Sequence, residues 1–84
     1  MKLGEIYEND FMRQIEIFPM PLSHPRTTIT ITQRTDFIAK GEWNETEINW
    51  QSIGAHNAAD TELFTKAMSY AVKTAKRWDA ERVK

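Results

Sequence analysis

The spacing of apolar residues along this chain has two regimes. Between residues 12 and 50, apolar and polar positions alternate with a period of two, as in a β-strand with one buried face. Between residues 58 and 82, apolar residues recur every three or four positions, as in an α-helix buried along one side. The pattern predicts an α+β fold: a three- to four-stranded antiparallel sheet followed by one long C-terminal helix packed on one face. For residues 1–10 it predicts no element, and we expect a flexible terminus.

Two segments carry the clearest strand patterns. Residues 13–18 alternate so that Ile15 and Ile17 share one face, with Gln14 and Glu16 on the other. Pro19 ends the run because proline has no amide hydrogen to donate, which suits a strand at the sheet edge. In residues 27–33, Ile29 and Ile31 alternate with threonines, and such β-branched residues favour a strand. The loop between these strands holds all three prolines of the chain. We interpret it as a stiff crossover, with a docking segment for an aromatic groove as the alternative.

A hairpin is predicted after the second of these strands. Residues 37–43 alternate again, and Asn44-Glu45 has the length of a two-residue turn. The register that follows places large residues opposite small ones: Trp43 with Thr46, Gly41 with Ile48, and Ala39 with Trp50. We therefore expect both tryptophans on the helix-facing side of the sheet, in the core.

The helix is predicted over residues 58–82, with Asn57 as its N-cap and Asp60 near its positive end. Its apolar stripe consists of Leu63, Phe64, Ala67, Met68, Ala71, Ala75 and Trp78. A helix of about 25 residues is about 37 Å long, which exceeds the length of a short strand, so we expect its distal end to overhang the sheet. An indole left in water there would be unfavourable, so we expect a homodimer in which Ala75 and Trp78 contact a second subunit.

Composition narrows the class of protein. The chain has 84 residues, 40% of them hydrophobic, with three glycines and three prolines, so we expect one folded domain over residues 1–84. It has no cysteine, which excludes disulfides and thiol chemistry and fits a reducing cytoplasm. Its first residues form no signal-peptide pattern, and no apolar run approaches the length of a membrane span. We expect a cytoplasmic protein that has no membrane partner.

The near-neutral net charge conceals an uneven distribution of acidic and basic residues along the chain. The formal net charge is −1, without the basic excess typical of nucleic-acid or membrane-surface proteins. Residues 1–57 carry five basic and eight acidic side chains, a net charge of −3, whereas residues 58–84 carry six basic and four acidic side chains, a net charge of +2. Because basic residues are favoured towards helix C-termini, we interpret the helix charge as a solvated face.

Residues that point to catalysis are few. Ser52 and His56 lie four apart before the helix, and such a pair would serve a small hydrolase only if the side chains met beside a pocket. The acidic residues at the predicted hairpin tip are interpreted as solvating it, because a tip does not bury a carboxylate. Two isolated histidines and no cysteine predict no metal site, and three scattered glycines predict no phosphate loop. We expect no enzyme and no cofactor.

The sheet face opposite the helix is the candidate binding surface. The strand pattern places Thr28, Thr30, Thr32, Arg34 and Lys40 there. The expected function is that of a small non-enzymatic interaction module, a homodimer that binds another macromolecule. The alternative is binding of single-stranded DNA or RNA across this open face, because some dimeric binders combine four antiparallel strands with one helix.

Overall fold

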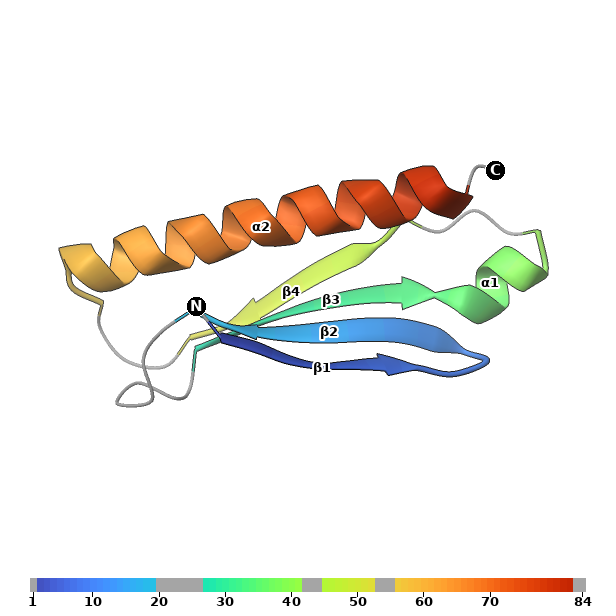
Figure 1. The fold of residues 1–84 in the computed structure, drawn as a ribbon, viewed down its shortest axis with the longest axis horizontal. Helices are drawn as coiled ribbons and strands as arrows, with labels where there is room; N and C mark the ends of the chain where they lie inside the picture. The colour runs from blue at the N-terminus through green and yellow to red at the C-terminus, as the bar shows by residue number, and fades with distance from the viewer. Residues whose placement is uncertain (1, 20–26, 42–44, 53–55, 83–84) are drawn as a thin grey trace.

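A four-stranded antiparallel sheet and one long helix make up most of the structure (Figure 1). The computed structural model describes residues 2–19, 27–41, 45–52 and 56–82. The strands lie in the order of the chain, β1-β2-β3-β4. The elements are β1 (Lys2–Glu8), β2 (Met12–Phe18), β3 (Thr28–Arg34), a short helix α1 (Thr35–Ala39), β4 (Glu47–Gln51) and the helix α2 (Ala58–Arg82). The predicted α+β fold is confirmed.

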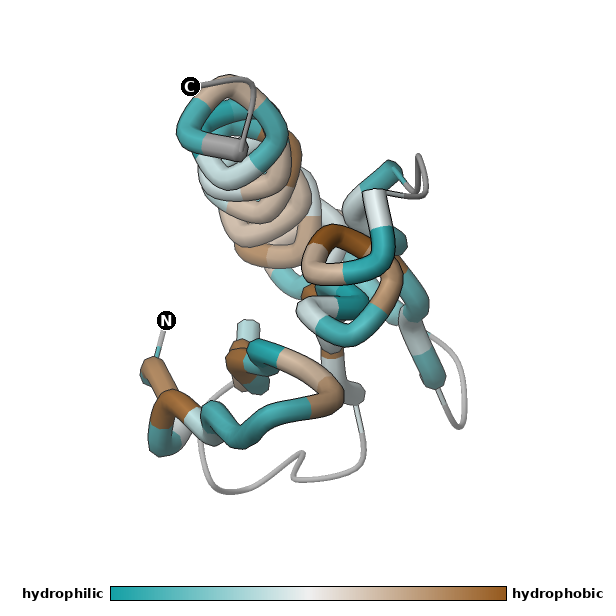
Figure 2. Tube along the Cα trace, turned by 90° about the vertical axis from the view of Figure 1, so that its right-hand side faces the viewer, coloured by the Kyte–Doolittle hydropathy of each residue, from teal (hydrophilic) through white to brown (hydrophobic). Residues whose placement is uncertain are grey.

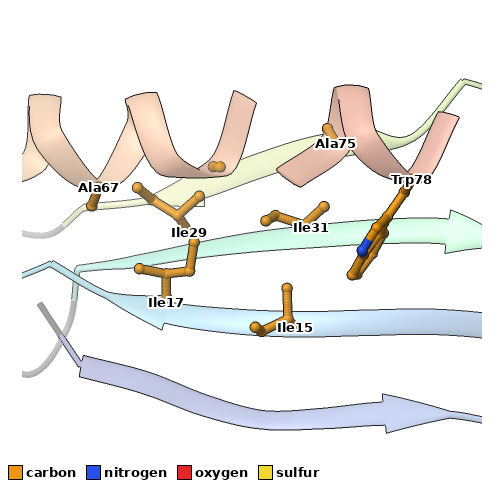
Figure 3. Close-up of a cluster of buried hydrophobic side chains, with 8 residues drawn as sticks. Ile15, Ile17, Ile29, Ile31, Ala67, Ala75 and Trp78 are labelled. Carbon is orange, nitrogen blue, oxygen red and sulfur yellow. The ribbon is translucent and has the colours of Figure 1, made fainter. Parts of the chain in front are cut away.

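The core lies between α2 and the inner face of the sheet (Figure 3). Alternation along β2 and β3 brings Ile15, Ile17, Ile29 and Ile31 to this face, where each is buried. From the helix come Ala67, Ala71, Ala75 and Trp78, at the predicted spacing. The small alanine side chains let the helix backbone approach the isoleucines closely, while the indole fills the space near the end of α2.

Polar contacts fix the C-terminal end of α2 to the sheet. Gln33 continues the inner face of β3, and its buried amide nitrogen donates to the Trp78 carbonyl at 3.2 Å. Asp79 accepts hydrogen bonds from the backbone N–H and the hydroxyl of Thr46, at 3.0 and 2.6 Å. The Arg13 guanidinium lies 4.1 Å from the centre of the Trp78 ring and forms an ion pair with Glu81. This end of the helix is therefore the fixed end.

The helix overhangs the sheet at its N-terminal end, not at the predicted distal end (Figure 1). None of the described residues from 58 to 66 is buried, and burial begins at Ala67. Trp78 is 2% exposed and Ala75 6% exposed within the single chain. The prediction that these two residues contact a second subunit is therefore wrong, because the core of the same chain already covers them.

The first strand was not predicted. β1 pairs with β2, which moves β2 from the predicted sheet edge to the interior. Leu3 pairs with Ile17 and Ile6 with Ile15, so a step of three residues on β1 spans a step of two on β2. This irregularity puts residues three apart on the same face and removes the period of two that reveals a strand. The expectation of a flexible terminus over residues 1–10 is wrong for the described part of that segment.

The strand predicted over residues 37–43 is also absent from its described part. Residues 35–39 form α1, with Asp36 in the first turn and Gly41 just after the end. Gly41 has φ of +76°, and its N–H donates to the Ile38 carbonyl at 2.9 Å, which is how glycine commonly ends a helix. β4 pairs instead with β3, Ile48 with Ile31 and Trp50 with Ile29, so the predicted hairpin register is wrong. Trp43, Asn44 and residues 20–25 of the proline loop lie outside the described residues.

Candidate interaction surface

The β1–β2 hairpin carries the largest group of exposed apolar side chains in the described structure. Leu3, Ile6 and Tyr7 on β1 and Phe11 in the turn are between 45% and 64% exposed. Figure 2 shows the first strand at the side of the sheet away from α2, with apolar positions along it. Exposed apolar side chains that gather on one segment mark an interaction surface more often than scattered ones. We call these four residues the hairpin surface.

Leu3 and Ile6 are exposed because α2 does not reach β1, whereas Tyr7 points to the uncovered outer face and Phe11 lies in the turn. The helix packs on β2, β3 and β4, and the buried core contains no side chain from the described part of β1. Leu3 and Ile6 share the inner face with Ile17 and Ile15 through their pairing, yet they lie beyond the cover of the helix. β1 is also an edge strand, so its backbone is paired within the sheet only to β2. Apolar side chains and an open strand edge thus occur together.

The turn that presents Phe11 is built by Asn9. The Asn9 carboxamide oxygen accepts hydrogen bonds from the N–H groups of Phe11 and Met12, at 2.8 and 2.9 Å. The Asn9 N–H donates to the Met12 carbonyl at 2.9 Å, which closes the hairpin. This side-chain turn is typical of asparagine. Asn9-Asp10 between two apolar segments is the sequence signal from which β1 and the hairpin surface were predictable.

The outer face of the sheet is polar. Thr28, Thr30 and Thr32 lie there as predicted, since they alternate with the buried isoleucines of β3. A hollow of about 450 Å³ is lined by Glu16, Thr28, Thr30, Asn49, Trp50 and Gln51. Lys40 does not belong to this face, because it caps the end of α1 beyond the sheet. The predicted set of five residues is therefore only partly brought together.

Arg34 is committed to a local ion pair. Its guanidinium donates to both carboxylate oxygens of Asp36, at 2.9 and 2.6 Å, and lies 4.1 Å from the centre of the Phe37 ring. The hydrogen bonds from Arg34 lower the pKa of Asp36, and the same contact raises the pKa of Arg34. A phosphate would have to displace Asp36 to engage this guanidinium.

The exposed end of α2 forms a second hollow with β4. Trp50 lies on the inner side of β4, but its predicted place in the core is wrong: it is 62% exposed. The helix and the edge strand are far apart at this end of the sheet (Figure 1). Trp50, Ser52, His56, Thr61 and Phe64 line a space of about 240 Å³. The Ser52 hydroxyl lies 2.5 Å from His56 Nε2, and the imidazole meets the Phe64 ring edge-on. The two residues that the sequence singled out for a hydrolase do meet beside a hollow.

Within the described ranges, no helix has both the length and the apolar character needed to cross a bilayer. The same part of the chain holds no group of three histidine, cysteine or acidic side chains arranged for a metal ion. Comparisons with family models, curated proteins and solved structures gave no match to this chain. The fold and its surfaces are therefore the basis for a functional proposal.

Proposed function

We propose that this protein is a small non-enzymatic interaction module that self-associates through the hairpin surface and, as a homodimer, binds another macromolecule. The observation that carries the proposal is the coincidence of an edge strand with the hairpin surface, outside the cover of α2. Edge strands that stay monomeric are usually blocked by charge, proline or a covering element. β1 contains no proline and lies outside the cover of α2, and its apolar side chains occupy both faces of the strand. Its three charged residues, Lys2, Glu5 and Glu8, are of both signs, so they do not form a row of like charge along the edge.

The hollow around Trp50 supports the second part of the proposal. It lies at the opposite edge of the sheet from β1, so a dimer formed through β1 leaves it accessible. An exposed indole beside Phe64 offers an apolar anchor of the kind that macromolecular interfaces use. The Ser52–His56 contact joins residues four apart in the segment before α2. We assign to this contact a structural role, holding the residue after β4 next to the start of α2, and not a catalytic one.

A matched pair of variants tests self-association. Ile6 is 61% exposed at the β1 edge and Trp50 is 62% exposed at the β4 edge, so a charge at either position is compatible with the folded chain. Ile6→Lys should abolish the dimer, measured by light scattering, because it buries an unpaired charge in the interface. Trp50→Lys should leave the dimer intact. Equal behaviour of the two variants would contradict the assignment of the hairpin surface.

Binding of single-stranded DNA or RNA is the competing function, and the outer face gives it less support. Glu16 and Glu47 are exposed on that face, and Arg34 is paired with Asp36. We expect no binding of a labelled single-stranded DNA or RNA oligonucleotide at about 50 mM salt, where phosphate contacts are strong. Binding that weakens steeply towards about 200 mM salt would replace the proposed module with a nucleic-acid binder.

A further inference from the structure

The bulge in β1 changes which of its residues would lie opposite one another if two copies of the strand paired about a two-fold axis. In a regular strand, residues three apart point to opposite faces. In β1, Leu3 and Ile6 both point to the inner face, because their partners on β2 are Ile17 and Ile15. Lys2 and Tyr7 both point to the outer face, as their partners Phe18 and Gln14 do. Residues at equal distances on either side of the point between Gly4 and Glu5 therefore point to the same face of the sheet: Leu3 with Ile6, and Lys2 with Tyr7.

We propose, resting on the proposed function, that the partner at β1 is a second copy of this chain, paired antiparallel about a two-fold axis between Gly4 and Glu5. Leu3 then lies opposite the partner's Ile6 on the inner face, and Lys2 lies opposite the partner's Tyr7 on the outer face. Glu5 lies opposite the partner's Gly4, where no side chain opposes it. The two sheets join into one continuous antiparallel sheet, and the symmetry closes the assembly at a dimer.

The chemistry of the strand selects this register. Apolar side chains meet apolar side chains on the inner face, and the Lys2 ammonium meets an aromatic ring on the outer face. Of the two shifts by one residue, one sets Lys2, which points outward, against the partner's Ile6, which points inward. The other places Glu5 opposite the partner's Glu5, and like charges directly opposite are destabilising. The same shift sets Leu3, which points inward, against Tyr7, which points outward. A partner with an unrelated strand would not use the internal symmetry that the bulge creates.

Cysteine cross-linking tests the register without background, because the chain contains no cysteine. Directly opposed residues of antiparallel strands have Cα atoms about 4.5–5.5 Å apart, within reach of a disulfide. Leu3→Cys and Ile6→Cys, mixed in equal amounts under a glutathione redox buffer, should form a mixed disulfide. Leu3→Cys mixed with Tyr7→Cys is the matched control, and its yield should be at least tenfold lower. All three positions are exposed, so the variants should fold, as far-UV circular dichroism verifies.

The outcomes separate this inference from the proposed function. A dominant disulfide between a tagged Leu3→Cys chain and an untagged Ile6→Cys chain supports the register. An equal or higher yield from Leu3→Cys with Tyr7→Cys indicates the shifted pairing and overturns the proposed register. A wild-type chain that sediments as a dimer, while neither mixture forms a disulfide, overturns the β1 pairing and leaves self-association standing. A wild-type monomer overturns both proposals.

Discussion

At the scale of single residues, side chains are held by contacts that the strand pattern does not reveal. Arg34 and Asp36 are two apart at the junction of β3 and α1, and their paired hydrogen bonds hold the short helix against the sheet end. Trp78 combines burial with the overlying Arg13 guanidinium. Each arrangement makes a specific prediction about stability.

The Arg34–Asp36 pair predicts a pH-dependent contribution to stability. Hydrogen bonds from Arg34 lower the pKa of Asp36 in the folded chain. The contribution is therefore fully present above the ordinary aspartate pKa of about 3.9 and is lost as pH falls through the lower folded value. Asp36→Asn should be less stable than the wild type at neutral pH, with the difference closing below about pH 4, measured by urea unfolding. Arg34→Gln should raise the NMR titration midpoint of Asp36, and an unchanged midpoint would contradict the pairing.

Two substitutions of Trp78 should lower the free energy of unfolding by different amounts. Its indole nitrogen is buried, and among the described residues no hydrogen-bond partner for it is found. Trp78→Phe should therefore lose packing volume without losing a hydrogen bond, at a cost of about 1–2 kcal/mol in the free energy of unfolding. Trp78→Ala should cost about 3–5 kcal/mol because it leaves a large cavity. Chemical denaturation measures both, and a Phe variant as unstable as the Ala variant would show that the indole N–H is bonded.

At the scale of elements, regular periodicity predicts a strand or helix directly, whereas a departure from it is signalled only by single turn and capping residues. Strands β2 and β3 and the helix α2 follow uninterrupted patterns of period two and period 3.6, and the structure has them where the sequence predicts them. The bulge in β1 hid the strand by breaking its period. The alternation from residue 37 predicted a strand over residues 37–43, but Asp36 and Gly41 are helix start and stop signals that outweigh it.

The start of α2 predicts a specific capping effect. The Asn57 side-chain oxygen accepts a hydrogen bond from the Asp60 N–H at 2.8 Å, as the sequence predicts for an N-cap. Asn57→Ala should lower the free energy of unfolding by about 1 kcal/mol, because the N–H loses its partner. Asn57→Ser retains an acceptor and should cost only a few tenths. Urea unfolding followed by far-UV circular dichroism distinguishes the two, and equal stabilities would contradict the cap.

At the scale of the whole molecule, the difference in length between α2 and the strands decides which surfaces stay exposed. A helix of 25 residues is about 37 Å long, against about 23 Å for a strand of seven. The sequence predicted the overhang but not its end, because the contacts of Gln33 and Asp79 that fix the C-terminal end join residues far apart in the chain. The hairpin surface was not predicted, because the bulge in β1 breaks the period of two that reveals a strand.

Self-association through β1 is the central claim, and its most direct measurement is sedimentation equilibrium of the wild-type chain at micromolar concentrations. We predict the mass of two chains, each 9.8 kDa, dissociating on dilution to a folded monomer whose helix content is unchanged. The Ile6→Lys variant should give the single-chain mass under the same conditions. A wild-type chain with the mass of one chain across this range would contradict the account.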